Sequence, residues 1–380
     1  MFDLKSIVRP NIYALKPYRC ARDDYSSGIL LDANENSHGS SLPQNSSFVN
    51  GNLERYPDPY QLEIKEKLCK LRNIQSTNRF FLGVGSDECI DMAIRVFVQP
   101  GKEKILITPP TYGMYSVSAN INDAGIAKVP LIVEGGKFQL DVPSILKEIQ
   151  QDPTIKLVFL CSPGNPTGTL LAQTDIVQIL ESGFKGIVFV DEAYIDFCAD
   201  ASCSSLVEKY PNLIVSQTLS KAFGLAGIRL GYTISSPEIA QIFNNTKAPY
   251  NISTLTSNIA NQALGDGLPV MASYVASIKE QRKLLMIQMS KLPFIGGFLG
   301  THDANFVLAQ FVNKQGIPDN GVAMDIYKHL AEISGVVVRF RGNELGCLGC
   351  LRITVGTPEE NATLISYLQS KDIQEIANKY

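Results

Sequence analysis

A lysine at position 221 lies inside the stretch TLSKAFGLAGIRLGY, which runs from residue 218 to residue 232. A lysine amine can form a Schiff base with a carbonyl compound, so Lys221 is a candidate catalytic group. Gly224, Gly227 and Gly231 follow it, and glycine usually marks a turn or a place where another group comes close to the backbone. An isolated lysine is more often a solvated surface residue, so the rest of the chain must decide between the two interpretations.

Other polar residues follow short apolar runs that have the character of strands. Asn165 follows KLVFLC, Asp191 and Tyr194 follow GIVFV, and Ser86 and Asp87 follow RFFLGVG. In open parallel sheets, ligands bind beyond the carboxyl ends of the strands. We therefore expect these side chains and Lys221 to meet around one ligand.

Three of these side chains suit an aromatic ring that carries a nitrogen and a phenolate oxygen. Asp191 can hold a proton on a pyridine-type nitrogen and keep the ring cationic. Asn165 and Tyr194 can form hydrogen bonds with the phenolate oxygen. Together with a carbonyl for Lys221 to bind, these are features of pyridoxal phosphate.

A phosphate site is expected close to the same side chains. A helix that starts at Ser86 and Asp87 can bind an anion through its backbone N–H groups. Ser220 adds a hydroxyl and Arg229 a guanidinium, which favours phosphate binding. The residues around Lys221 therefore predict pyridoxal phosphate as the cofactor.

The elements that must position these residues alternate between helical segments and short buried runs. The segments QLEIKEKLCKLR and DECIDMAIRVFV have apolar residues at helical spacing. Runs too short for a helix and rich in β-branched residues occur at 104–108, 156–161, 186–192 and 212–218. This pattern predicts an α/β fold with a mostly parallel central sheet flanked by helices.

The composition along the chain predicts three parts. Residues 36–52 are rich in serine, asparagine and glycine and are expected to form a loop or arm. After about residue 270, a long helical segment, a helix at 321–333 and the runs NFVLAQF, GVVVRF and CLRITVG indicate a smaller α+β domain. We predict an N-terminal arm and part of the small domain at 1–53, a large cofactor-binding domain at 54–270, and a small C-terminal domain at 271–380.

Composition excludes several classes of function. Of the 380 residues, 45% are hydrophobic and 19% charged, as in ordinary globular proteins, and the net charge of −3 argues against a nucleic-acid partner. No apolar run approaches the roughly 20 residues that span a bilayer. We expect a cytoplasmic protein with no membrane partner and with its eight cysteines reduced.

Metal and nucleotide sites are both disfavoured. Cys347 and Cys350 have CxxC spacing, but there is no second such pair, and the three histidines are scattered. GVGSDE starts like a dinucleotide fingerprint, yet Glu88 stands where the third glycine belongs, and no GxxxxGK[ST] occurs. No metal is therefore expected.

The motifs SPGNPTG, DEAYIDF, PPTYGMYSVSA and TLSKAFGLAGIRLGY resemble those of the fold-type I pyridoxal-phosphate-dependent aminotransferases. More narrowly, the chain resembles the histidinol-phosphate aminotransferase family, and LKPY, LDANEN, ERYPDP and CLRITVGTPEE extend the resemblance over nearly the whole chain. The resemblance implies a homodimer with its active sites at the subunit interface. It also implies amino transfer between L-histidinol phosphate and 2-oxoglutarate, in histidine biosynthesis.

The resemblance further implies roles for single residues. Lys221 would bind the cofactor and shuttle a proton, with Asp191 and Tyr194 as the other catalytic residues. Tyr112 would stack on the cofactor ring, and Tyr56 of the neighbouring subunit would join the phosphate site. The residues expected to bind substrate are Tyr18, Asn34, Asn165, Arg339 and Arg352.

Two alternatives remain open at this point. One is another enzyme on the same scaffold, either an aromatic aminotransferase or a decarboxylase of a phosphorylated amino acid. The other is a pyridoxal-phosphate-binding regulator that has lost catalysis. Such regulators usually carry an extra DNA-binding domain, for which there is no room before residue 54, and the joint presence of Lys221, Asp191 and Asn165 also favours catalysis.

Overall fold

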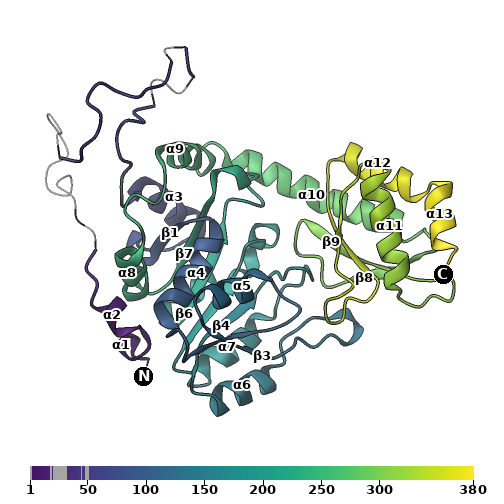
Figure 1. Cartoon of the computed structure of the whole chain (residues 1–380), viewed down its shortest axis with the longest axis horizontal. Coiled ribbons are helices and arrows are strands. Elements are labelled where there is room, and N and C mark those ends of the chain that lie inside the picture. Colours follow the sequence, from purple (N-terminus) through teal and green to yellow (C-terminus); the bar gives the residue numbers. More distant parts are fainter. Residues whose placement is uncertain (1, 18, 20–31, 44, 48–50) are drawn as a thin grey trace.

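The computed structural model describes residues 2–17, 19, 32–43, 45–47 and 51–380. A larger unit surrounds a seven-stranded sheet, a smaller unit surrounds a four-stranded sheet, and the long helix α10 connects the two (Figure 1). The strands are β1 (Phe80–Val84), β2 (Lys104–Ile107), β3 (Gly125–Lys128), β4 (Ile155–Cys161), β5 (Ile187–Asp191), β6 (Leu213–Thr218), β7 (Leu230–Ile234), β8 (Ile295–Leu299), β9 (Phe306–Phe311), β10 (Arg339–Phe340) and β11 (Cys350–Thr354).

Helices cover both sheets. They are α1 (Leu4–Ile7), α2 (Pro10–Tyr13), α3 (Leu62–Arg72), α4 (Gly85–Phe97), α5 (Met114–Ile121), α6 (Val142–Gln151), α7 (Gln173–Glu181), α8 (Pro237–Thr246), α9 (Thr254–Ala263), α10 (Leu268–Met289), α11 (Asn320–Glu332), α12 (Pro358–Leu368) and α13 (Lys371–Ala377). None of these described helices has the length and apolar character needed to cross a membrane.

The large sheet has the order β1-β7-β6-β5-β4-β2-β3. Strands β3, β2, β4, β5 and β6 run parallel to one another, whereas β7 runs antiparallel to both β6 and β1. The four predicted runs are confirmed as β2, β4, β5 and β6. In the register of the sheet, Cys161 lies opposite Asp191, and Asp191 lies opposite Ser216. The carboxyl ends of β4, β5 and β6 therefore meet at one edge.

Alternating side chains of the sheet build two cores. Phe159 of β4 and Phe189 of β5 pack with α4, α5 and α8 on one face. Leu160 and Val190, the next residues, pack with α3, α6 and α7 on the other face. Because successive residues of a strand point to opposite faces, continuous apolar runs are what a sheet covered on both sides requires.

The smaller unit packs α11, α12 and α13 against its antiparallel sheet, of order β10-β11-β9-β8. The run GVVVRF was expected to be a strand, but only Arg339 and Phe340 pair with β11. These residues form the edge of the sheet, where one partner strand is present instead of two. Helix α10 reaches both units, since Met271 and Val275 pack near Tyr194 while Leu285 lies in the small core.

The N-terminal segment makes its described contacts with the larger unit. Three apolar side chains of this segment pack in the same core as α4 and α8. They are Ile7 of α1, Val8 in the connection and Ile12 of α2. This differs from the expectation that part of 1–53 joins the small domain, because the apolar side of this segment is buried against the large sheet's helices. In the described part of 36–52 there is no helix or strand, as predicted for an arm.

Candidate active site

A cavity of about 450 Å³ opens at the carboxyl ends of β4, β5 and β6, between the two units. Most side chains predicted to bind cofactor or substrate line it, although they come from distant parts of the sequence. The predicted residues in this lining are Ser86, Asp87, Tyr112, Asn165, Asp191, Tyr194, Ser220, Lys221, Arg229, Arg339 and Arg352.

Asp191 ends β5 and lines this cavity although only 2% of its surface is exposed. The hydroxyl of Tyr115 donates a 2.7 Å hydrogen bond to Oδ2, whereas Oδ1 has no hydrogen-bond partner among the described residues. Burial raises the pKa of the Asp191 carboxyl to about 6, against the hydrogen bonds from Tyr115 and the Ala193 N–H, which lower it. A buried oxygen without a partner is destabilising, and a ligand with a protonated ring nitrogen would satisfy it.

Helix α4 starts directly after β1, with Ser86 and Asp87 in its first turn. Two glycines allow this start to lie against β7. A Cβ on Gly231 would lie 2.4 Å from the backbone nitrogen of Ser86, and Gly85 has a left-handed φ of 73°. The first N–H groups of a helix lack partners within it, so this end of α4 suits a phosphate.

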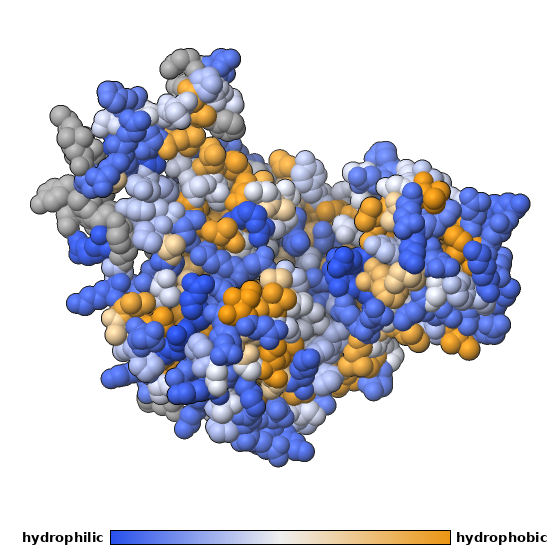
Figure 2. Space-filling model, viewed as in Figure 1, coloured by the Kyte–Doolittle hydropathy of each residue, from blue (hydrophilic) through white to orange (hydrophobic). Residues whose placement is uncertain are grey.

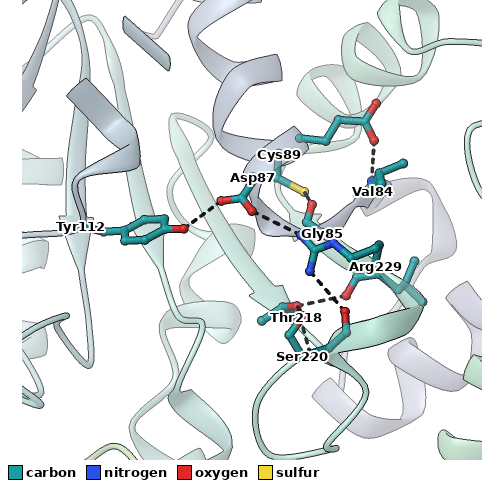
Figure 3. A network of polar contacts seen from close by, with 11 residues as sticks. Val84, Gly85, Asp87, Cys89, Tyr112, Thr218, Ser220 and Arg229 are labelled. Atoms are coloured by element: carbon teal, nitrogen blue, oxygen red, sulfur yellow. Dashed lines mark hydrogen bonds and ion pairs between the residues drawn. The ribbon is translucent and has the colours of Figure 1, made fainter. Parts of the chain in front are cut away.

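Asp87 holds two other predicted residues beside the start of α4 (Figure 3). Its Oδ2 is 3.2 Å from Nη2 of Arg229, and its Oδ1 accepts a 3.1 Å hydrogen bond from the hydroxyl of Tyr112. Nearby, the hydroxyl groups of Thr218 and Ser220 are 2.9 Å apart. The Arg229–Asp87 pair is nearly half exposed on both sides and therefore weak, so the guanidinium can turn to a phosphate at little cost.

Lys221 extends its amine into the cavity, with Nζ 5.5 Å from the centre of the Tyr194 ring. Lys221 is exposed to solvent within the open cavity, yet partial desolvation by the cavity walls lowers the pKa of its ammonium, and the charge of Arg352 lowers it further. A lowered pKa increases the fraction of neutral amine, which is the nucleophilic and basic form. The position and the electrostatics of Lys221 both suit chemistry rather than a surface role.

The small sheet forms the opposite side of the cavity. Arg352 of β11 lies directly across the strand pair from Arg339 of β10. Nη1 of Arg352 donates a 2.5 Å hydrogen bond to Oδ1 of Asn165, which connects the two units. Arg341 also lines the cavity. This side can therefore bind an anionic part of a ligand.

Three predicted residues do not line the cavity within one chain. Tyr56 is 53% exposed and stacks on Tyr250, with ring centres 4.6 Å apart. Asn34 lies near Tyr56 in a separate hollow beside α9. Tyr18 lies outside the described residues.

Two residues of the site were missed from the sequence. Tyr115, which holds Asp191, is three positions after Tyr112 in PPTYGMYSVSA, one helical turn away. Arg341 is two positions after Arg339 in VRFRG, and a two-residue period puts side chains on the same side of a strand. The spacing of Tyr115 and Arg341 from predicted site residues is visible in the sequence. It indicates a role in the site only when the strand or helix that each residue faces is known.

The CxxC pair has a structural role. Cys347 and Cys350 are fully buried in the core of the large unit. Burial raises the pKa of the Cys347 thiol to about 12, which disfavours the reactive thiolate. The cysteines among the described residues are free thiols, as expected.

Comparisons with known proteins support the same interpretation. Residues 26–368 match the family model described as aminotransferase class I and II. The histidinol-phosphate aminotransferase of Candida maltosa is 50% identical over 97% of this chain and 98% of its own length, and that of Saccharomyces cerevisiae is 50% identical over 100% of both. The solved histidinol-phosphate aminotransferase of Sinorhizobium meliloti, in complex with pyridoxal-5'-phosphate, covers 94% of this chain and 93% of its own, with a TM-score of 0.75 and 23% identity. The predicted fold class is thereby confirmed.

Proposed function

The chain belongs to the aminotransferase class I and II family, and from this premise we propose the reaction that its cavity carries out. It exchanges an amino group between L-histidinol phosphate and 2-oxoglutarate, giving imidazole acetol phosphate and L-glutamate, in histidine biosynthesis. The observation that carries the proposal is one cavity that joins Lys221, the unsatisfied carboxylate of Asp191 and a wall of arginines. The relatives at 50% identity carry the name of this activity.

The residues present fit pyridoxal phosphate. The unpartnered Oδ1 of Asp191 would accept a hydrogen bond from the protonated ring nitrogen, and Asn165 and Tyr194 would bind the ring oxygen. Lys221 would hold the cofactor covalently through its amine, and Tyr112 would lie against the ring. The phosphate would be bound by backbone N–H groups at Ser86 and Asp87, where α4 starts, and by the side chains of Ser220 and Arg229.

When bound, pyridoxal phosphate supplies a carbonyl for the substrate amine and a ring that withdraws electrons from the substrate carbon. The chain's own groups then control protons and charge. Nζ of Lys221 is the base that removes the proton from the substrate carbon, and the lowered pKa of Lys221 favours that form. The Asp191 carboxylate keeps a positive charge on the ring nitrogen, since the two charges stabilise each other in a buried site.

The anionic group of the substrate would bind on the small-unit wall, which is the side of the cavity formed by Arg339, Arg341 and Arg352. Arg352 is partly buried and already oriented by Asn165, so it can bind the carboxylate of glutamate or the phosphate of histidinol phosphate in turn. Arg339 adds a second charge for the phosphate. Asn34 and Tyr18 remain proposed substrate contacts on the basis of the family resemblance.

We also propose a homodimer whose sites are shared between subunits. Tyr56 does not reach the cavity of its own chain, and its neighbourhood exposes apolar side chains on α3, α9 and α10. These are Leu62, Leu255, Ile259, Val270 and Tyr274. Figure 2 shows apolar surface along the upper edge of the larger unit, where Figure 1 labels α9. A second copy could cover this surface, and the family resemblance implies that its Tyr56 joins the phosphate site. The domain boundaries at 53 and 270 and the cytoplasmic location also remain predictions.

Subunit mixing tests the shared site. Lys221→Ala and Tyr56→Ala homodimers should be inactive or weakened, whereas a mixed dimer has one site with neither change. Co-refolding the two variants should restore part of the wild-type rate. No recovery, with subunit exchange demonstrated by differently tagged chains, would mean that each site is built from one chain.

The reaction itself is tested by amino transfer to 2-oxoglutarate from histidinol phosphate, histidinol, histidine, phenylalanine and aspartate. Charged hydrogen bonds to the phosphate predict a preference for histidinol phosphate over histidinol of about 10-fold or more in kcat/KM. Equal rates with histidinol or phenylalanine would instead favour a general aromatic aminotransferase.

A further inference from the structure

Arg341 lines the cavity but has no role in the reaction as described so far. Its backbone N–H donates a 2.9 Å hydrogen bond to the carbonyl oxygen of Cys350, which continues the pairing of β10 with β11 by one step. Arg339, two residues earlier, lies directly opposite Arg352. Since side chains two residues apart on extended backbone share a side, all three arginines point to the cavity side of this small sheet.

Three like charges at adjacent positions are unfavourable without an anion between them. Arginines directly opposite each other, such as Arg339 and Arg352, destabilise a pair of strands. Arg341 lowers the pKa of Arg352 more than Arg339 does, although burial is the largest cause. Arg341 is therefore the cation that Arg352 experiences most strongly.

One carboxylate on this wall offsets part of the charge. Nη1 of Arg341 is 2.8 Å from Oε1 of Glu344, and both side chains are about three-quarters buried, at 22% and 27% exposure. Nε of Arg341 is buried and has no hydrogen-bond partner among the described residues. Three guanidinium groups and one carboxylate leave an excess of two positive charges on the wall.

An excess of this size matches a phosphate monoester, which carries a charge of about −1.5 to −2 near neutral pH. Glutamate carries two separate carboxylates, and its α-carboxylate, which takes the place of the phosphate group of histidinol phosphate, carries one negative charge and needs only one of these cations. Arg341 and Arg339 differ in burial, because Arg339 is exposed and its side chain forms no ion pair among the described residues. A charge-assisted hydrogen bond is stronger where water is partly excluded.

We propose that Arg341 is the specificity-determining residue for the phosphate of the amino donor, with Glu344 orienting its guanidinium. Arg352 then serves both substrates, and Arg341 distinguishes the phosphorylated one from glutamate. The proposal rests on the proposed function, because it assigns the phosphate end of that substrate. It predicts that loss of Arg341 changes the preference between two substrates rather than the rate with both.

The test compares Arg341→Gln and Arg341→Lys holoenzymes with wild type. Losing one charged hydrogen bond should lower kcat/KM for histidinol phosphate by about 10- to 150-fold, mainly through KM, while kcat/KM for glutamate changes by less than about threefold. Arg341→Lys should recover part of the loss, since it keeps the charge without the guanidinium's paired donors. Arg95→Gln on α4 is the matched control, because Arg95 also pairs with an acid on its own segment, Asp91, but lies outside the cavity lining.

Inorganic phosphate provides a second measurement that does not depend on turnover of the donor. As a competitive inhibitor of the glutamate half-reaction, it should bind Arg341→Gln more weakly than wild type. It should bind Glu344→Gln more tightly, because glutamine can still orient Arg341 through a hydrogen bond but no longer offsets its charge, and Glu344 is the acid that pairs with Arg341 among the described residues. Circular dichroism and thermal melting establish that each variant is folded.

The outcomes separate this inference from the proposed function. If wild type uses histidinol phosphate and folded Arg341→Gln keeps the wild-type ratio between the two substrates, Arg341 is not the phosphate residue and the proposed function stands. An equal loss with both substrates would also overturn the assignment of specificity. If wild type cannot use histidinol phosphate at all, the proposed function itself is contradicted.

Discussion

The two sides of the cavity are built in different ways. On the side of the large sheet, Asp191 and Asn165 lie at strand ends and are 2% and 8% exposed, and the hydroxyl of Tyr115 fixes the carboxylate. On the side of the small sheet, Arg339 lies on the short edge strand β10 and is exposed. Arg341 directly follows β10, Arg352 lies in the middle of β11, and both are partly buried. The first side is rigid and nearly satisfied, whereas the second has more positive charge than its acids can balance.

The difference corresponds to what each side has to bind. A cofactor that stays in place can be bound by buried groups in fixed positions. One oxygen of Asp191 remains available for the ring nitrogen of the cofactor. An aminotransferase accepts two different amino compounds in turn, so the other side must accommodate a phosphate and then a carboxylate. A surplus of arginines with partial solvent access meets that need, because water can replace whichever contact is absent.

The largest effect should come from removing the amine on the rigid side. Lys221→Ala should lower kcat by at least about 10²- to 10⁴-fold, the usual contribution of a positioned acid–base group. The variant should still bind pyridoxal phosphate, since the phosphate and ring contacts remain. Steady-state kinetics and absorbance after gel filtration measure both. Lys209→Ala, at an exposed lysine, is the control, and turnover near the wild-type value in Lys221→Ala would mean that another group moves the proton.

The second effect concerns the stability of the rigid side without cofactor. The pKa of Asp191 is raised from 3.8 to about 6 in the folded protein, chiefly by burial, so the folded state binds the extra proton. Stability of the apoprotein should therefore fall as the pH rises from about 4 to 6, and the full penalty should be present above pH 6. A shift of two pH units corresponds to about 3 kcal/mol, so apo Asp191→Asn should be more stable than wild type by up to that amount at pH 7.5.

Urea denaturation of the apoprotein at pH 4 and pH 7.5 measures this difference. With pyridoxal phosphate bound, the order should reverse, because wild type regains the partner for Oδ1 and the variant does not. The variant should also turn over slowly. Equal apo stabilities at pH 7.5 would show that Asp191 is not strained by its burial.

The smallest of the three effects lies on the small-sheet side. Arg352→Ala should lower kcat/KM by about 10- to 150-fold with both histidinol phosphate and glutamate, the value of one charged hydrogen bond. Arg339→Ala should affect histidinol phosphate more than glutamate, and less than Arg341→Gln does. Both half-reactions can be followed by single-turnover absorbance. Unchanged kinetics in Arg352→Ala would mean that Arg352 does not bind substrate and only connects the two units through its hydrogen bond to Asn165.

Much of the rigid side was predictable from the sequence because its residues follow strands. Asp191 is the last residue of β5 and Lys221 follows the end of β6 by three residues, and the ends of neighbouring parallel strands meet at one edge. Strand β7 was not predicted, because its residues were read as the end of the lysine motif. It is antiparallel and buried between β1 and β6, and this pairing is visible only in three dimensions.

The small-sheet side was harder to predict for a physical reason. Arg339 and Arg352 were assigned by family resemblance, and Arg341 was missed, because a charged residue on a short edge strand looks like any solvated arginine. Its position depends on how the small unit packs against the large one, through α10 and the contact between Arg352 and Asn165. Contacts between residues 187 positions apart have no local signal in the sequence.

The most direct test of the central claim is to find which lysine holds the cofactor. The purified protein is incubated with pyridoxal phosphate, reduced with borohydride, digested and mapped by mass spectrometry. The account predicts one dominant modified peptide, with the reduced cofactor on Lys221, and loss of that label in Lys221→Ala. A dominant label on any other lysine, with Lys221 unmodified, would contradict it.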